Sequence, residues 1–573
     1  MSRLKIFLII LTFTSVFAKK DVIFQCDEAM IYDENKNFCT ISNFVAESDQ
    51  TVHIVHNSNK NNVKYMKCYD SKARYIPYKL FENFPNLQSL DISNSYIEDI
   101  SRNSFHSADN LLYLNMSLNR IKSLGPSAFK GAAKTLKIEL AANEISEISP
   151  NAFNTLDDMD KLVLSRNLIR ELDKSVFVEN VNLNHIHLDN NLIEEINPDL
   201  FSYCKHLRIV DLSNNRLKKL QPNTFELNFV LEGLFLSGNL LETFNLTNLY
   251  SLNKLNLDNN RLTSLVLIAV KNVRANNNEI ENITVRNFEN FETMNLAHNH
   301  ISNLTNITKL SNLVSLDLSS NKVGPVIGLS TFSNLRNLRE LRLRNTSLSS
   351  ITFGMFSKQT KLTTFDISFN GLRELNLDML APYMTTVKQF FIDGNSLTEI
   401  KGRTTFFQAF PYLYSIGLSK NKFNCTYLHH IITTPFLSPN VELYIEPIDS
   451  DIEKTHIRDI TCEHEDQKDD YDDEILIPKK PMKVKMTKEK ELSSQEREMF
   501  IAKIQGQQEL LSSHLLWMKI TLITIAVALI CFVVFKSMDY KRRLWRSVPH
   551  QNHVGDSSIV FRSTTTVNTT GEA

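Results

Sequence analysis

Residues 207–225 read LRIVDLSNNRLKKLQPNTF, and the same arrangement returns every 24 residues over a long part of the chain. Seven phenylalanines keep this step: Phe81, Phe105, Phe129, Phe153, Phe177, Phe201 and Phe225. Asparagines keep it as well: Asn119, Asn143, Asn167, Asn191, Asn215 and Asn239. A fixed period in this range predicts one small unit of structure per repeat, and such units bury their apolar faces by stacking on their neighbours. The sequence therefore predicts a solenoid.

Most units have apolar residues at positions 1, 4, 6, 11 and 14 and an asparagine at position 9, and many have a phenylalanine at position 19. In the quoted stretch these positions hold Leu207, Val210, Leu212, Leu217, Leu220, Asn215 and Phe225. Side chains alternate across a strand, so we expect positions 4 and 6 to point inward and positions 3, 5 and 7 outward. We expect the asparagine amide to bond buried backbone groups where the strand turns away.

This spacing resembles the extracellular leucine-rich repeat. Sixteen units are predicted, and they start near Val63, Leu87, Leu111, Thr135, Met159, Leu183, Leu207, Leu231, Leu252, Val270, Phe291, Leu313, Leu338, Leu362, Val387 and Leu413. The expected fold class is an α/β solenoid, a leucine-rich repeat horseshoe with a parallel concave β-sheet and disulfide caps, together with one transmembrane helix.

The middle of the repeat region is irregular. From Leu231 to Leu313 the steps shrink to 21, 18, 21 and 22 residues, and the phenylalanine is lost. The strand pattern persists there, as in Leu255, Leu257 and Asn260. We therefore expect the missing residues to come from the convex side, with a local change of curvature or twist.

The N-terminus is typical of a cleaved secretory signal over residues 1–18, with a basic start, an apolar run and Ala18 before Lys19. Seven Asn-x-Ser/Thr sequons follow on the expected lumenal side: Asn115, Asn245, Asn282, Asn303, Asn306, Asn345 and Asn424. Together they predict a glycosylated extracellular domain.

Four of the seven cysteines flank the repeats. We expect Cys26 to pair with Cys39 in an N-terminal cap (residues 19–62), and Cys425 with Cys462 in a C-terminal cap (residues 423–462), around repeats at 63–422. Such caps cover the apolar end faces of a secreted solenoid. Pairing of Cys68 with Cys26 or Cys39 stays open, because sequence does not fix connectivity. Cys68 and Cys204 otherwise fit small core positions.

Composition changes after residue 462. Residues 463–514 form a charged stalk with a helical segment, and residues 515–535 hold a single charge, Lys519, over a length of about 31 Å that suits a bilayer core. Basic residues follow at once, so residues 536–573 are expected in the cytoplasm. These features predict a single-pass type I protein of the plasma membrane, with a dimer partner or co-receptor as a further expectation.

The sequence offers no basis for catalysis. It has no Walker loop, GxSxG or HExxH motif, so no enzyme and no cofactor are expected. The 63 basic and 64 acidic residues nearly cancel, which argues against nucleic-acid binding. His185 and His187 share an outward face as half of a metal site, but no third ligand is evident, and no metal is expected.

The predicted concave face suggests where a partner would bind. Its position 5 holds the candidate ligand-binding residues, which are His187, Phe235, Arg274, Arg342 and Phe391. Aromatic residues flanked by arginine are typical of binding hot spots, although packing against a neighbouring strand side chain is the more ordinary explanation for Phe235 and Phe391. Asn115 is also at position 5, so a glycan there would keep a ligand away from the N-terminal concave region.

The cysteine-flanked ends and the segments RYIPYKLFENFPNLQSLDIS (residues 74–93) and NKFNCTYL (residues 421–428) are similar to mosquito complement-pathway leucine-rich repeat immune proteins and to Toll-like ectodomains. The resemblance implies an insect cell-surface receptor or co-receptor that binds a protein or microbial ligand, with a role in innate immunity. A cell-adhesion or guidance molecule is the alternative.

Overall fold

The structure is a computed structural model of the chain, which divides into two units, Met1–Lys468 and Asp469–Ala573. It describes residues 22–25, 38–42, 45–46, 52–55, 63–69, 71–76, 79–245, 249–433, 441–444, 455–457 and 460–462, all in the first unit. The expected signal peptide, Cys26, the stalk, the membrane span at 515–535 and the tail lie outside the described residues. Among the helices that are described, none has the length and apolar character needed to cross a membrane.

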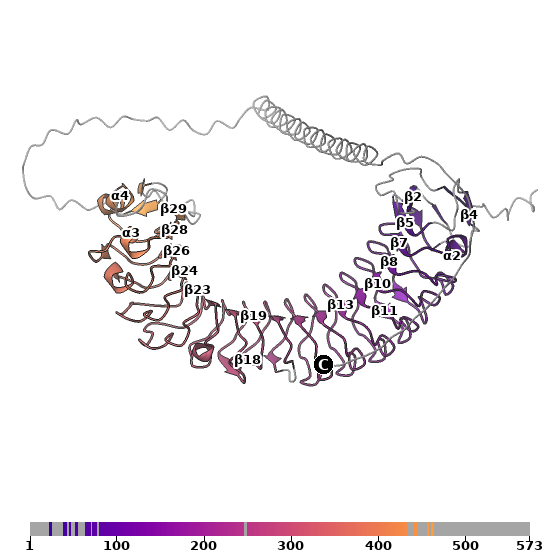
Figure 1. The fold of residues 1–573 in the computed structure, drawn as a ribbon, viewed down its shortest axis with the longest axis horizontal. Coiled ribbons are helices and arrows are strands. Elements are labelled where there is room, and N and C mark those ends of the chain that lie inside the picture. The colour runs from indigo at the N-terminus through magenta and orange to yellow at the C-terminus, as the bar shows by residue number, and fades with distance from the viewer. Residues whose placement is uncertain are drawn as a thin grey trace, which may run out of the picture. The chain divides into compact units, whose positions relative to one another are not determined.

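One long parallel sheet organises the first unit, and every repeat contributes one short strand to it. Figure 1 shows these strands side by side along the inner face of the curved stack of repeats. In spatial order they are β2 (Phe38–Ser42), β5 (Tyr65–Tyr69), β7 (Ser89–Asp91), β8 (Tyr113–Asn115), β10 (Lys137–Glu139), β12 (Lys161–Val163), β13 (His185–His187), β14 (Ile209–Asp211), β15 (Gly233–Phe235), β17 (Lys254–Asn256), β19 (Asn272–Arg274), β21 (Thr293–Asn295), β22 (Ser315–Asp317), β23 (Glu340–Arg342), β24 (Thr364–Asp366), β26 (Gln389–Phe391), β28 (Ser415–Gly417) and β29 (Glu442–Tyr444). The predicted solenoid with a parallel sheet is confirmed.

The sheet extends one strand beyond the predicted repeats at each end. Strand β2 lies before the first expected unit at Val63, and β29 lies after the last unit. Cys39 and Ile41 of β2 are buried like the inward residues of a regular repeat. The leucine spacing did not reveal these two strands, because Cys39 stands at position 4 of β2 and Leu443 is the only leucine in β29.

In most repeats the asparagine at position 9 forms hydrogen bonds to the repeat before it. The side-chain oxygen of Asn215 accepts a hydrogen bond from the N–H of Ile193 (3.0 Å), and its Nδ2 donates to the carbonyls of Leu188 and Leu212 (both 3.0 Å). Asn119, Asn143, Asn167, Asn191 and Asn239 donate to backbone carbonyls in the same way. These asparagines form a ladder of side-chain amides along the repeats. As predicted, the ladder provides hydrogen-bond partners for backbone groups that have none where each strand turns away.

The phenylalanines at position 19 form a continuous buried stack. All seven rings from Phe81 to Phe225 are at most 1% exposed, and neighbouring ring centroids lie 5.4–6.2 Å apart. These separations are typical of favourable aromatic pairs. The stack fills the space behind the sheet and fixes the spacing of the first repeats.

A second set of polar side chains, at position 22, was not predicted. Asn180 donates to the carbonyls of Phe153 and Leu156, and Asn228 donates to those of Phe201 and Cys204. Gln359 makes the same pair of bonds in its own repeat, to Phe332 and Leu335. Cys204 occupies this position between them and is buried and free, as the sequence suggested.

Short strands and helices cover the other sides of the repeats. The parallel pairs are β1 (Val22–Gln25) with β4 (Val52–Val55), β3 (Val45–Ala46) with β6 (Lys72–Ala73), β9 (Ser123–Leu124) with β11 (Glu147–Ile148), and β25 (Leu375–Asn376) with β27 (Ile400–Lys401). The helices are α2 (Leu80–Asn83), η2 (Ile307–Lys309), η3 (Leu377–Met379), α3 (Phe406–Ala409) and α4 (Cys425–Thr433).

The short middle repeats form a sheet of their own away from the long one. Strands β16 (Thr243–Phe244), β18 (Ser264–Leu267) and β20 (Asn282–Val285) pair in parallel there. Phe244, Leu265 and Ile283 of these strands, at position 14 of their units, are buried. The long sheet keeps its register through this region. The shorter repeats therefore lack residues in the segments outside the sheet, as predicted. The expected change of curvature stays a prediction.

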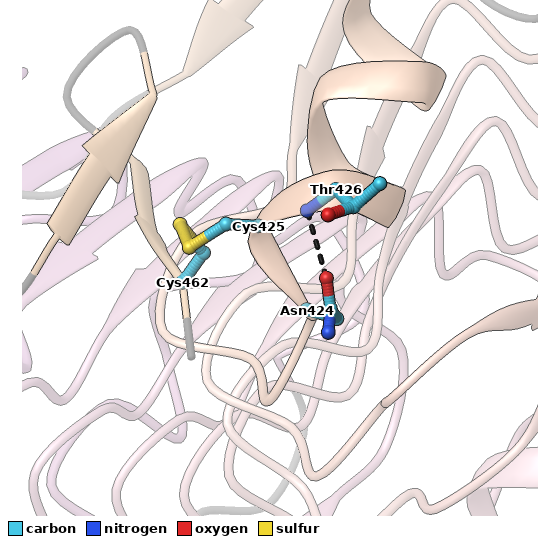
Figure 2. Close-up of a disulfide and its surroundings, with 4 residues drawn as sticks. All are labelled: Asn424, Cys425, Thr426 and Cys462. Carbon is cyan, nitrogen blue, oxygen red and sulfur yellow. Dashed lines mark hydrogen bonds between the residues drawn. A yellow bond between two sulfur atoms is a disulfide. The ribbon is translucent and has the colours of Figure 1, made fainter. Parts of the chain in front are cut away.

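The C-terminal end of the repeats is closed by α4 and a disulfide. Cys425, at the start of α4, is joined to Cys462 with their Cα atoms 5.0 Å apart, as predicted (Figure 2). Cys462 ends the antiparallel pair β30 (Thr455–Ile457) and β31 (Ile460–Cys462). The side-chain oxygen of Asn424 accepts from the N–H of Thr426 (2.7 Å) at the start of the helix. Buried Leu428 and Ile431 fix α4 to the last repeat.

At the N-terminal end, Cys39 in β2 is disulfide-bonded, whereas Cys68 is free and buried. This excludes the two alternatives that involved Cys68. The expected partner of Cys39, Cys26, lies outside the described residues, so that pairing stays a prediction.

Candidate functional site

Parallel register places the position-5 residues of successive repeats next to one another on the concave sheet. His187 is opposite Asp211, which is opposite Phe235, and Asn256 and Arg274 follow on the next two strands. Further along, Arg342, Asp366, Phe391, Gly417 and Tyr444 form a second continuous row. The five candidate residues therefore fall into two groups, which Asn295 and Asp317 separate.

Many polar residues in this row have a structural task that the sequence analysis missed. An aspartate or asparagine at position 5 accepts a hydrogen bond from the N–H two residues later and so ends the strand; this holds for Asp91, Asn115, Asp211, Asn256, Asn295, Asp317 and Asp366. The signal was visible as an Asp or Asn followed two residues later by a small or polar residue. Candidate binding residues are better sought where position 5 departs from this pattern.

Phe235 departs from it and packs against the backbone of its own strand at Gly233. Its ring covers Gly233, two residues earlier on the same face: a Cβ at Gly233 would lie 3.1 Å from the Phe235 ring and 2.7 Å from Ile209. The glycine thus makes room for the aromatic ring. Phe235 is half-buried by this packing and keeps its other face toward solvent.

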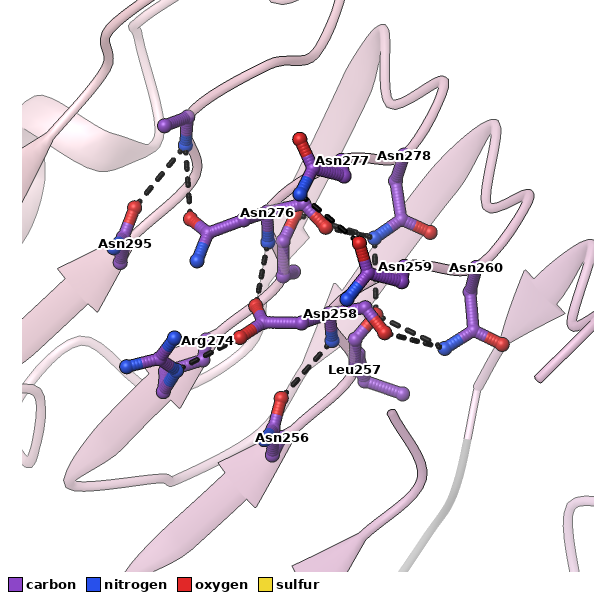
Figure 3. A network of polar contacts seen from close by, with 12 residues as sticks. Asn256, Leu257, Asp258, Asn259, Asn260, Arg274, Asn276, Asn277, Asn278 and Asn295 are labelled. Atoms are coloured by element: carbon purple, nitrogen blue, oxygen red, sulfur yellow. Dashed lines mark hydrogen bonds and ion pairs between the residues drawn. The ribbon is translucent and has the colours of Figure 1, made fainter. Parts of the chain in front are cut away.

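Arg274 is held by a buried carboxylate. Its Nε lies 2.8 Å from Oδ2 of Asp258, while Oδ1 of Asp258 accepts from the N–H of Asn276 (2.8 Å), as Figure 3 shows. Asp258 is 6% exposed, whereas the arginine side chain is 60% exposed. Asp258 therefore fixes one edge of the guanidinium and leaves the rest available to a partner.

His187 has two carboxylates beside it. Three potential ligand atoms, one each from His187, Asp189 and Asp211, lie within 4.8 Å of one another. The two aspartates are potential metal ligands beside His187 that the sequence did not reveal. Burial lowers the pKa of His187, as does the charge of Lys161, and the two aspartates oppose this shift. His185 does not join the group, because its Nδ1 lies 4.0 Å from Asp160 instead.

The second row is rich in aromatic and cationic groups. The rings of Phe391 and Tyr444 meet edge to face with centroids 5.3 Å apart. Arg342 is paired with Glu340 at 3.3 Å. The guanidinium of Arg344 lies 4.0 Å from the ring centroid of Phe369 and donates to Ser368. Phe391 therefore packs on exposed Tyr444, which lies two strands away, and the two rings share one surface.

The most exposed apolar side chains of the middle repeats lie elsewhere, on the side from which the chain enters the strands. We call this the strand-entry face, and its apolar members are Val181, Tyr203, Leu227, Phe229, Val230 and Tyr250, which are 38–63% exposed. Each stands one to four residues before the first leucine of the next unit, over four successive repeats. Sequence reasoning missed this group because it examined only the concave positions.

A cavity of about 610 Å³ continues the same face beyond Tyr250. Its lining includes Lys271, Arg339, Lys361 and Glu292. Lys271 pairs with Glu292 at 3.0 Å, and Lys361 donates to Asn337 at 2.8 Å. The strand-entry face therefore combines an apolar part with a charged part.

All seven sequon asparagines are among the described residues, and none is buried. Asn115 is on the concave strand β8, where its Oδ1 accepts from Ser117, and Asn282 is in β20. None of the seven lies within the four residues before a repeat start, which are the residues of the strand-entry face. Glycans at these positions would leave that face open.

The repeat pattern also matches known families. Residues 71–121, 110–169 and 157–217 match a leucine rich repeat family, and residues 269–378 and 297–413 match the BspA type leucine rich repeat region. With one strand per repeat in a long parallel sheet, the chain is a leucine-rich repeat protein.

Several solved structures are similar to this chain. They include the LRIM1/APL1C complex (19% identity, covering 93% of this chain and 84% of that one, TM-score 0.52), the TLR13-ssRNA13 complex (22%, 69% and 57%, 0.50) and the glycosylated form of the Toll–Spatzle complex of Drosophila (20%, 71% and 57%, 0.51). At these identities the likeness shows the fold alone. A comparison with curated proteins found no match.

Proposed function

We propose that this chain is a cell-surface recognition protein that binds a protein ligand through its leucine-rich repeats. Repeat solenoids provide broad, rigid surfaces for such contacts. The repeats present aromatic and charged side chains in ordered rows on such surfaces.

The exposed apolar group of the strand-entry face carries this proposal. Exposed apolar patches of neighbouring residues mark interaction sites more often than scattered single residues do. Tyrosine and phenylalanine are enriched where protein partners bind, and a charged rim such as that formed by Lys271, Arg339 and Lys361 is typical of such interfaces. A protein partner suits this mixture better than a lipid surface, because acidic Glu289 and Glu292 line the same cavity.

The extracellular location is proposed from the sequence. The signal-like residues 1–18, the seven sequons and the apolar segment 515–535 agree on a single-pass protein with its repeats outside the cell. Exposure of the sequon asparagines is compatible with glycosylation. The Cys425–Cys462 disulfide suits an oxidising compartment.

A role in innate immunity is the specific form of the proposal. One of the similar structures, the Toll–Spatzle complex, is described as a molecular hub in Drosophila development and innate immunity. The resemblance of the flanking segments points the same way. A protein or microbial ligand captured at the surface is therefore the expected partner, with a dimer or co-receptor to carry any signal.

Proximity labelling on intact cells tests the proposal with three matched variants. The first replaces Tyr203, Phe229 and Tyr250 by serine. The control replaces Leu118, Val326 and Leu329 by serine, because these are equally exposed (59–65%) but lie outside the strand-entry face. The third is Phe235→Ala with Arg274→Ala and Arg342→Glu on the concave sheet.

We expect the first variant to lose the extracellular proteins that the wild type labels, and the control to keep them. Loss in the third variant alone would move the footprint to the concave sheet. Equal labelling by all variants at equal surface levels would refute both surfaces.

Adhesion remains the second candidate, since an apolar face is also suited to a counterpart on another cell. Aggregation of cells that express the chain, abolished by the Tyr203, Phe229 and Tyr250 variant, would favour adhesion. Induction by infection with capture of a soluble ligand would favour recognition.

A further inference from the structure

The concave face carries a cluster of three potential metal ligands that is independent of the strand-entry face. His187 ends β13, Asp211 ends the adjacent β14, and the two residues are in register. Asp189 follows two residues after His187 and therefore lies on the same face. One ligand atom from each residue comes within 4.8 Å of the others.

We infer that His187, Asp189 and Asp211 bind a divalent cation that prefers mixed nitrogen and oxygen ligands. Zn²⁺ is such a cation and is the probe used to test the site. Metal–ligand bonds for Zn²⁺ are about 2.0–2.2 Å for imidazole nitrogen and carboxylate oxygen. An ion between the three atoms reaches them after side-chain shifts smaller than about one ångström. Imidazole and carboxylate together suit Zn²⁺ better than Ca²⁺, which takes six to eight oxygen ligands.

The two carboxylates are already oriented by neighbours. The hydroxyl of Ser165 donates to Oδ1 of Asp189 at 2.5 Å, and Asn190 donates to its Oδ2 at 2.7 Å. The N–H of Ser213 donates to Oδ1 of Asp211 at 3.0 Å. Hydrogen bonds of this kind hold metal ligands in position in known sites.

The imidazole is the member of the cluster without another task. Among the described residues, no hydrogen bond or ion pair to the His187 ring is present, although the ring is only half-exposed on the sheet. Asp317 ends its strand in the same way, because its side chain accepts a hydrogen bond from the N–H of Ser319. The residues in register with Asp317 are Asn295 and Arg342, and neither is a histidine. Asp317 therefore provides an internal control with the same backbone role and no ring nitrogen on the strands beside it.

With three protein ligands, the ion would keep open coordination positions that face the concave surface. A site of this kind resembles the open sites of catalytic zinc in its ligand count. On a recognition protein those positions are available to a histidine or carboxylate of a partner. The cation site itself does not depend on the proposed function.

Isothermal titration of Zn²⁺ into the full chain, purified in mild detergent and treated with EDTA before dialysis, tests the site. We expect His187→Gln and Asp189→Asn each to weaken one Zn²⁺-binding event by more than about tenfold, and Ser165→Ala to weaken it by about tenfold. Asp211→Asn keeps the acceptor for Ser213 and is expected to lose the ion without loss of fold, which circular dichroism checks.

Asp317→Asn is the matched control and is expected to bind Zn²⁺ like the wild type. Unchanged Zn²⁺ binding in both His187→Gln and Asp189→Asn would overturn the inference, as would no binding event in the wild type at millimolar Zn²⁺. An equal loss in Asp317→Asn would also overturn it, because the effect would then not be specific to the cluster.

Discussion

The ring of Phe391 meets the ring of Tyr444 edge to face, although a whole strand lies between them. That strand carries Gly417 at the position between the two residues, and a Cβ there would lie 1.8 Å from Oδ2 of Asp393. Gly417 thus makes room for the carboxylate of Asp393, and it has no side chain of its own between the two rings, which come from the outer two of three adjacent strands.

A double-mutant cycle should detect this bridge. We expect Phe391→Ala and Tyr444→Ala to be coupled by about 0.5–1.5 kcal/mol in urea unfolding, the usual contribution of an aromatic pair beyond its buried area. Phe235→Ala, on a distant strand, should show no coupling with Tyr444→Ala. Coupling as small for the first pair as for the second would mean that the ring contact contributes nothing.

Removal of one ladder asparagine should cost far more than removal of a neighbouring surface residue. Asn215→Ala leaves the N–H of Ile193 and the carbonyls of Leu188 and Leu212 without this partner. Each buried polar group left unsatisfied costs about 1–3 kcal/mol, so we expect a loss of at least about 2 kcal/mol in urea unfolding. Exposed Arg216→Ala should stay within about 0.5 kcal/mol of the wild type. Similar losses in the two variants would contradict the assigned role of the ladder.

The two thiols that are free among the described residues, Cys68 and Cys204, should be inert in the folded protein. Burial raises the pKa of Cys204 to about 12, and burial with the charge of Asp91 raises that of Cys68 to about 12. Thiolate is the reactive form, so iodoacetamide at pH 8 should modify neither residue until denaturant is added. Peptide mass spectrometry reads both sites separately. Rapid labelling of Cys204 without denaturant would show that the interior opens between repeats.

Asp366 should make stability depend on pH. Burial raises the pKa of this carboxyl, and hydrogen bonds from Ser368 and the charges of Arg344 and Arg342 oppose the shift. A raised pKa means that the folded state favours the protonated form. The stabilisation is thus fully present below the unfolded pKa of about 3.9 and is lost as pH rises through the folded value.

Asp366→Asn keeps the acceptor for Ser368 and removes the buried charge. Relative to the wild type, this variant should therefore be more stable at pH 7 than at pH 3, and its free energy of unfolding from urea titrations at the two pH values measures the difference. A difference that is independent of pH would show that the carboxyl titrates alike in the folded and unfolded chain.

The parts of the fold that repeat were predictable, and the parts that vary were not. Asn215 and Phe225 recur with the same residue type at the same position, so their roles followed from spacing. Position 22 uses Asn180, Asn228 and Gln359 for one task with two residue types, and the pattern was missed. Strand β29 was missed because Leu443 is the only leucine that marks it.

The candidate site was harder, since its residues meet only through register. Asp189 and Asp211 are 2 and 24 residues from His187 in sequence, and only the stacked strands bring all three side chains together. Phe391 was singled out as an exposed aromatic, yet its contact with Tyr444 depends on a strand outside the predicted repeats. The apolar residues of the strand-entry face could have been found in the sequence, by a search for apolar residues among the four positions before the first leucine of each unit.

The bonds of Asn215 reach back 27 and 22 residues and no further, so each coil is fastened only to its immediate neighbours. Such a molecule can gain or lose whole coils through duplication or deletion in its gene without reshaping the coils farther away. The abbreviated coils between Leu231 and Leu313 fit this kind of history, in which length is adjusted locally while the seam of amides runs on unbroken.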